Sequence, residues 1–174
     1  MFKKDKIYYL AIIWLSLFML GATPVFATNS ISIEFGEVDS DNQIVPILYN
    51  SSAEITGFQF FIIGMDVTNV FGGTAEENNF YLHQGSTCWR DDDCKDFVTG
   101  FSMSGSPIPA GSGTLFYLNY AEIGDDYFDE NISVNDLTCL DITEGFILGS
   151  QGNTFDVNIG ECMSSPIDCN GNYY

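Results

Sequence analysis

The stretch "GFSMSGSPIPAGSGTLFYLNY", residues 100–120, carries no charge in a chain whose formal net charge is −19. Apolar alternation at both ends predicts two strands, residues 97–104 and 114–120. Between them, Pro107 and Pro109 cannot donate hydrogen bonds to a ladder, and the glycines permit a positive φ, so this part is predicted to be a turn. It is not a phosphate-binding loop, because no lysine or helix follows it.

The same two-residue period recurs along the chain. Phe58, Phe60 and Ile62 share one face of "GFQFFIIG", and other short alternating runs are separated by Gly, Asn, Asp and Ser. Such runs are typical of antiparallel strands in a sandwich or barrel. The predicted fold class is therefore all-β, an antiparallel β-sandwich. Further alternating sets are Ile31, Ile33 and Phe35, and Phe97, Phe101 and Met103.

The first 27 residues have the three parts of a secretory signal peptide: the basic start MFKKDK, an apolar run over 7–22 and small residues before Thr28. An uncleaved anchor is the alternative, although the run is short for a membrane span. We expect a domain over 28–162, a tail over 163–174 and a secreted, extracellular or cell-surface location, without membrane insertion after cleavage.

Removing the signal makes the chain more acidic. Only Arg90 and Lys95 remain basic, and of the 24 acids only Asp5 is lost, so 23 acids face two cations and the net charge becomes −21. Such a surface repels nucleic acids and anionic membranes. We therefore expect neither as a partner.

The five cysteines should oxidise after secretion. "CWRDDDC" closes a small loop, so Cys88–Cys94 is the first predicted disulfide. A zinc site that combines these thiols with His83, the only histidine, is the less favoured alternative because the spacing is irregular.

The second disulfide follows from a predicted hairpin with its tip at Ser150 and Gln151. In that register Ile142 would face Ile159, Phe146 would face Phe155, and Cys139 would face Cys162. We predict Cys139–Cys162 with Cys169 left in the tail. The alternative is a local Cys162–Cys169 bond with Cys139 free.

"GFQFFIIG" followed by "GFSMSGSPIPAGSGTLFYLNY" resembles the cohesin-like modules of secreted and cell-surface proteins. In these, a small-residue turn leads into a strand with the pattern carried here by Gly113, Leu115, Leu118 and Tyr120, offset by about one residue. The resemblance spans residues 31–161. It implies a jelly roll of about nine strands, related to some carbohydrate-binding modules, that acts by docking and not by catalysis.

Acidic loops offer calcium as a candidate ligand, because calcium requires six to eight oxygen atoms. The favoured loop is "GDDYFDEN", and the competing reading is a solvated acidic turn. The "WRDDDCKD" segment ranks lower because Arg90 and Lys95 neutralise it internally. The candidate ligands in the favoured loop are Asp125, Asp126, Asp129 and Glu130.

Aromatic and apolar residues off the core face are the candidate binding residues. These are Trp89 in the small cysteine loop, and Leu115 and Tyr117 opposite the inward set of "TLFYLNY". They would contact a protein or polysaccharide partner, or else pack beneath a loop. A catalytic role for His83 is disfavoured because no nucleophile motif lies near it.

These features predict a non-catalytic binding or assembly module outside the cell. The alternatives are a small glycosidase-type enzyme and a structural surface or matrix protein. Two N-glycosylation sequons begin at Asn50 and Asn131.

Overall fold

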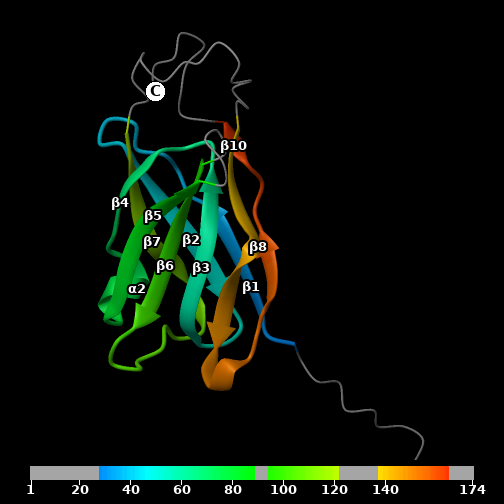
Figure 1. Ribbon diagram of the computed structural model, residues 1–174. Helices are drawn as coiled ribbons and strands as arrows, with labels where there is room; N and C mark the ends of the chain where they lie inside the picture. The colour runs from blue at the N-terminus through cyan, green and yellow to red at the C-terminus, as the bar shows by residue number, and fades with distance from the viewer. Residues whose placement is uncertain (1–27, 89–93, 122–136, 165–174) are drawn as a thin grey trace, which may run out of the picture.

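The computed structural model describes residues 28–88, 94–121 and 137–164. They form two five-stranded sheets packed face to face (Figure 1). The front sheet has the order β10-β8-β3-β6-β5, and its strands are β3 (Ile55–Ile63), β5 (Phe80–Cys88), β6 (Cys94–Ser102), β8 (Leu137–Gly149) and β10 (Met163–Ser164). The back sheet has the order β4-β7-β2-β1-β9, and its strands are β1 (Ser30–Phe35), β2 (Ile44–Ser51), β4 (Val67–Phe71), β7 (Gly111–Tyr120) and β9 (Asp156–Ile159).

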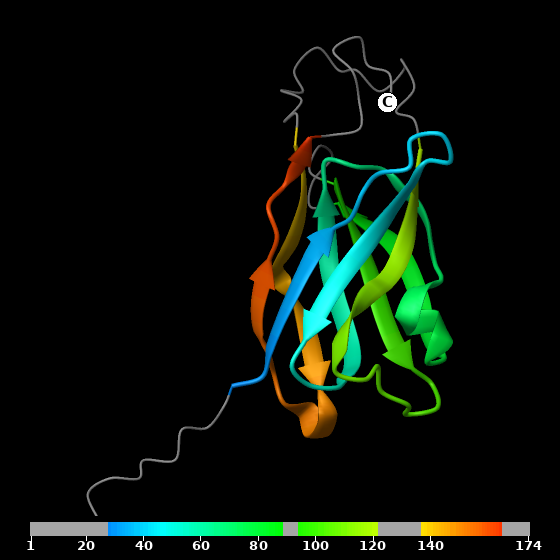
Figure 2. The same cartoon turned by 180° about the vertical axis from the view of Figure 1, so that it is seen from behind.

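All neighbouring strands pair antiparallel except β1 and β9, which run parallel. Seen from behind, β1, β2 and β7 form the near layer (Figure 2). The prediction of an all-β sandwich is confirmed. A five-residue helix, α2 (Gly73–Glu77), and a 3₁₀ turn, η2 (Ser150–Gly152), interrupt the strands.

The core lies between the sheets and is built from the alternating residues of both. Phe58 and Phe60 of β3 stack against Phe116 of β7 with ring centroids 5.6 and 5.7 Å apart. All three side chains are fully buried. Gly100 of β6 leaves room for this stack, because a Cβ there would overlap the Phe58 ring. The predicted inward set Phe58, Phe60 and Ile62 is therefore correct.

The predicted turn carries the chain from one sheet to the other. β6 ends at Ser102 in the front sheet, and β7 begins at Gly111 in the back sheet. Between them Ile108 is fully buried and exchanges two backbone hydrogen bonds with Ile55, 2.8 and 2.9 Å long. The uncharged segment is thus a crossover that closes one end of the core.

The predicted hairpin is right at its base and at its tip, where the turn Ser150–Gly152 is closed by an antiparallel bridge between Leu148 and Thr154, but not in between. Met163 pairs with Thr138 and Ser164 with Leu137, in the predicted register. Farther on, β9 leaves β8 and pairs with β1, so the predicted Ile142–Ile159 and Phe146–Phe155 pairs are wrong. Ile142 and Ile159 both pack against the core from different sheets. Two segments with matching apolar patterns can bury their apolar residues either as neighbours in one sheet or from opposite sheets across the core.

Two residues assigned to the tail, Met163 and Ser164, belong to the sandwich as β10. No helix in the described ranges is long and apolar enough to cross a membrane.

Candidate binding face

The outer surface of the front sheet carries aromatic side chains in register. Three rows of paired residues cross the strands in the order β5, β6, β3, β8. They are Tyr81–Phe101–Gly57–Leu148, His83–Thr99–Gln59–Phe146 and Gly85–Phe97–Phe61–Asp141. We call these twelve residues the front face.

Five rings of the front face form a continuous series. From Phe61 the ring centroids are 6.2 Å to Phe97, a further 6.2 Å to His83, 6.4 Å to Tyr81 and 5.5 Å to Phe101. Gly85 makes room for this series. A Cβ atom added to Gly85 would lie only 2.8 Å from Cζ of the Phe97 ring.

The outer part of the series lies open to solvent, and so does Phe146 of the neighbouring strand β8. Tyr81 is 53% exposed, Phe101 41% and Phe146 42%. Gly57 lies between Phe101 and Leu148 in this row. A Cβ atom added to Gly57 would have one neighbour within 4 Å, the carbonyl oxygen of Gly100. A contiguous exposed apolar surface of this kind marks an interaction site more often than scattered apolar residues do.

Phe146 reaches the front face through a large irregularity in β8. The register shifts between Gln59 and Phe61, so that the four residues 142–145 between Asp141 and Phe146 lie opposite Phe60 alone. Gly145 permits this, because its backbone packs on the Gln59 carbonyl where no Cβ fits. The Asp141 carboxylate accepts hydrogen bonds from the Thr143 hydroxyl and backbone N–H. These bonds, helped by Lys95, lower the pKa of Asp141.

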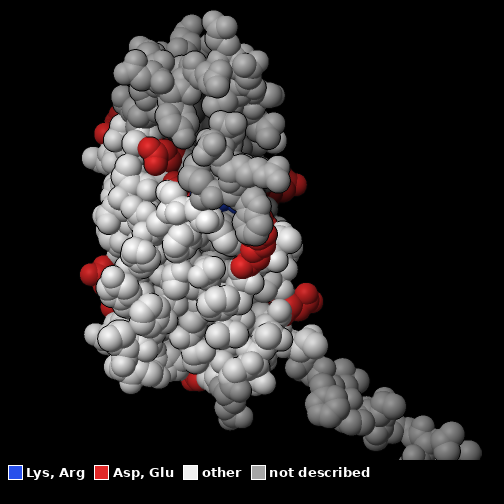
Figure 3. Space-filling model, viewed as in Figure 1, with Lys and Arg blue, Asp and Glu red and all other residues white. Residues whose placement is uncertain are grey.

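The front face is almost free of charge in a strongly acidic chain. None of its nine residues in β5, β6 and β3 is acidic, and Asp141 in β8 lies 3.7 Å from the Lys95 ammonium. In Figure 3 the lower left part of this side is largely uncharged, and acidic residues are seen at the edges and at two places higher on the surface. Desolvating such a surface costs less than desolvating carboxylates.

The opposite outer face holds a similar ring pair in a more covered position. Phe71 of β4 and Tyr117 of β7 are register partners with stacked rings 5.6 Å apart. Both are only partly exposed, and the chain at Gly72 passes close to the Tyr117 ring. The predicted binding residue Tyr117 is thus outward but partly covered.

Leu115, the second predicted binding residue, lies in the core. It is 1% exposed because the β2–β7 register shifts between Ile47 and Leu48. The irregularity turns Leu115 and Phe116 inward together, against the simple alternation that placed Leu115 outside. Trp89, the third predicted residue, lies outside the described residues.

The cysteine predictions have two outcomes. A disulfide joins Cys139 and Cys162, with Cα atoms 4.4 Å apart, and ties β8 to the segment between β9 and β10. Cys88 and Cys94 are backbone register partners at the ends of β5 and β6. Their side chains lie outside the described part of the structure, so the Cys88–Cys94 bond stays a prediction.

The predicted calcium ligands Asp125, Asp126, Asp129 and Glu130 also lie outside the described residues. Among the described residues no group of three or more His, Cys, Asp or Glu side chains is arranged to hold a metal ion.

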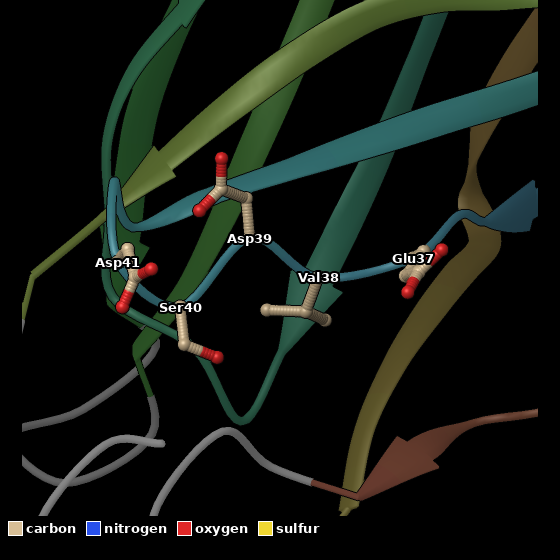
Figure 4. Close-up of a pocket in the computed structure, with 5 residues that line it drawn as sticks. All are labelled: Glu37, Val38, Asp39, Ser40 and Asp41. Atoms are coloured by element: carbon tan, nitrogen blue, oxygen red, sulfur yellow. The ribbon is translucent and has the colours of Figure 1, made fainter.

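An open hollow of about 520 Å³ lies at the turn after β1, lined by Glu37, Val38, Asp39, Ser40 and Asp41. Its three carboxylates point in different directions (Figure 4). The Asp39 carboxylate accepts hydrogen bonds from the side chain and backbone of Asn42, 2.8 and 3.1 Å long, which lower its pKa. Asp39 therefore stabilises the turn, and the hollow does not converge charge on a ligand.

One acid of the "WRDDDCKD" segment has a structural role. Asp96 is 9% exposed and accepts hydrogen bonds from the Val67 backbone N–H and the Ser86 hydroxyl, which links the two sheets. Partial burial, together with the charge of Asp96, raises the pKa of Asp66.

The sequence did not single out Tyr81, Phe101 and Phe146 as candidate binding residues. The sequence showed that Phe97 and Phe101 share one face of a strand, but it did not show whether that face points to the core or to solvent. The full burial of Val98 and the exposure of Phe101 show that this set is outward.

No protein-family model matches the sequence, and no curated protein matches it. Solved structures do resemble the fold. A chain from the complex of CaCohA2 with a CaDoc0917 variant has a TM-score of 0.50 at 14% identity, over 75% of this chain and 95% of that one.

A type I cohesin–dockerin complex of Clostridium thermocellum gives a TM-score of 0.48 at 15% identity, over 80% of this chain and 93% of that one. A non-cellulosomal cohesin of the archaeon Archaeoglobus fulgidus gives 0.46 at 14%, over 75% and 86%. The fold is cohesin-like.

Proposed function

We propose that this protein is a non-catalytic module that binds a protein partner through the front face. The observation that carries the proposal is the uninterrupted ring series from Phe61 to Phe101 with its outer members exposed. Aromatic residues on a rigid sheet supply large contact area at little entropic cost, and they dominate the energetics of many interfaces.

Two further facts support a protein partner. The CaCohA2 structure of similar fold was solved in complex with CaDoc0917. The front face is also broad and lies across four strands, whereas the hollow at the β1–β2 turn is a single loop. A location outside the cell fits the predicted signal peptide and the Cys139–Cys162 disulfide.

The alternatives predicted from sequence are a glycosidase-type enzyme and a structural surface or matrix protein, and a polysaccharide is the alternative partner of a binding module. A glycosidase requires two carboxyl groups on either side of the scissile bond. On the front face the carboxylate is that of Asp141, which is engaged by Thr143 and Lys95. The described geometry therefore favours binding over hydrolysis.

The test uses two matched double variants. Tyr81→Ser/Phe101→Ser removes a ring pair from the front face, and Phe71→Ser/Tyr117→Ser removes the corresponding pair from the back. Each protein is immobilised and used to capture ligands from an extract of the source organism.

We expect one protein to be retained by the wild type and by the back variant. Its affinity for the front variant should be lower by about 30-fold or more. Equal retention by all three proteins, or retention of polysaccharide alone, would contradict the proposal.

A further inference from the structure

We propose that Asn50, on the outer surface of the back sheet, is the acceptor of an N-linked oligosaccharide in the exported protein. This surface is not the one used by the proposed function, and the modification requires the export that the predicted signal peptide provides. The proposal follows from the sequon Asn50-Ser51-Ser52 and from the way the fold displays its three residues.

The alternation of β2 directs Asn50 away from the core. Tyr49 and Ser51, the residues on either side of it, are 6% and 3% exposed, whereas Asn50 itself is exposed. Its strand belongs to the near layer of Figure 2. A glycan is bulky and hydrated, so a folded protein carries it at a surface position of this kind.

The sequon residues alternate in the same way as the strand. Ser52, which supplies the required hydroxyl group, is exposed, and its Oγ atom accepts a 2.8 Å hydrogen bond from the Ser30 backbone N–H. The buried Ser51 hydroxyl donates to the Ala53 carbonyl. The two residue types that the sequon specifies are thus displayed, and the residue that it leaves open is buried.

The positions opposite Asn50 are occupied by small residues. Its register partner in β1 is Ser32, and its register partner in β7 is Ser112. No large side chain therefore stands opposite the Asn50 amide in either neighbouring strand, and an attached sugar has room above the sheet.

The Asn50 amide also has no part in holding the described fold together. Asn42, Asn78 and Asn119 donate hydrogen bonds from their side-chain amides to other residues of the protein. Within the described ranges the Asn50 side chain makes no such bond. Attaching a sugar there costs none of the hydrogen bonds that these ranges contain.

The transfer requires a polyprenyl-phosphate-linked oligosaccharide and an oligosaccharyltransferase of the secretory membrane. The side-chain amide nitrogen of Asn50 forms a bond to the anomeric carbon of the first sugar and gives up one proton to a base of the transferase. The bond between that carbon and a phosphate oxygen of the donor breaks, and the phosphate leaves with the electron pair.

The experiment isolates the protein released by the source organism and maps it by mass spectrometry. Cleavage after Glu37 and Glu54 yields the fragment 38–54, which contains the Asn50 sequon and not the second sequon at Asn131. We expect this fragment to be heavier by whole sugar residues, with a sugar retained on Asn50 after fragmentation. An unmodified fragment, or recovery of the protein only from inside the cell, would overturn the proposal.

Matched variants made in the same organism test the acceptor chemistry. Asn50→Gln and Ser52→Ala should lose the sugar from fragment 38–54, whereas Ser52→Thr and Asn131→Gln should keep it. Sugar retained in Ser52→Ala would contradict an N-linked site at Asn50. Capture of the partner through the front face is measured on the same samples, so failure of this proposal is distinguishable from failure of the proposed function.

Discussion

Two ring pairs of the same composition lie on opposite faces of this sandwich. Tyr81 and Phe101 join the edge strand β5 to β6, and Phe71 and Tyr117 join the edge strand β4 to β7. The first pair is 53% and 41% exposed, whereas both members of the second are partly covered. Local chain path, and not residue type, therefore decides which pair is available to a partner.

The difference begins at two glycines. Gly72 and Gly73 have φ values of 67° and 65°, and they direct the chain from β4 into α2. Gly73 packs so closely on the Leu115 carbonyl that no Cβ fits, and Gly72 passes beside the Tyr117 ring. β5 and β6 have no such cover from the described residues over Tyr81 and Phe101.

The largest effect is expected beneath the front face. Gly100→Ala places a methyl group inside the Phe58 ring and should destabilise the domain by about 3 kcal/mol. Gly113→Ala on β7 is the matched control, since its nearest atoms are 3.6 and 3.8 Å away. It should change the free energy of unfolding by less than about 1 kcal/mol. Urea unfolding compares them, and equal losses would contradict this packing.

The second largest loss of stability is expected on removal of the disulfide, because this bond lies where the chain passes from the back sheet to the front sheet. Cys139→Ala/Cys162→Ala opens a loop with a sequence separation of 23. The chain-entropy estimate for such a loop is about 3 kcal/mol, which strain and residual structure reduce. Thermal unfolding measures the loss, and non-reducing peptide mapping of the wild type should recover the Cys139–Cys162 fragment. A Cys162–Cys169 fragment would contradict the structure.

The ring pairs themselves should differ in stability. Phe71→Ser/Tyr117→Ser removes partly covered rings and should cost about 2 kcal/mol. Tyr81→Ser/Phe101→Ser removes exposed rings and should cost about 1 kcal/mol or less. Denaturant unfolding of the two variants at one pH gives the comparison. A larger loss for the front pair would mean that Tyr81 and Phe101 are structural.

The smallest expected effect is that of pH on two acids, Asp141 in β8 and Asp66 in the link between β3 and β4. The Asp141 pKa is lowered by Thr143, so the stability that Asp141 contributes is present above its unfolded value near 3.8 and is lost as pH falls through the folded pKa. Asp66 has a raised pKa, so its charged form opposes folding at neutral pH.

Asp66→Asn should therefore raise the melting temperature at pH 7, with a gain that fades as pH falls through the raised folded pKa of Asp66 and is absent below its unfolded value of 3.8. Asp141→Asn should lower it at pH 7, with a loss that fades in acid. Differential scanning calorimetry of both variants and the wild type at several pH values tests these two predictions. Shifts of the same sign in the two variants would contradict these pKa directions.

The sequence predicted the sandwich because alternation survives in single strands. Ile31, Phe58 and Phe60 are inward as their pattern required. It did not predict strand neighbours, since two apolar segments with matching patterns pair within a sheet or face each other across the core. Ile142 and Ile159 pack on the core from opposite sheets, because β9 pairs with β1.

The candidate binding residues were harder to predict for a related reason. Irregularities in β7 and β8 change the side on which Leu115 and Phe146 lie, and neither irregularity has a clear sequence signal. Gly145 is visible in the sequence, but its packing on Gln59 depends on a strand about 90 residues away. Tyr81 is the register partner of Phe101, so the two side chains share the exposed face, and this pairing joins residues 20 positions apart.

Hydrogen–deuterium exchange of the protein with and without its captured partner tests the central claim most directly. We predict slower exchange in peptides from β5 and β6 around Tyr81 and Phe101, with unchanged exchange in β4 and β7. Protection confined to peptides around Phe71 and Tyr117 would contradict the assignment of the front face as the binding surface.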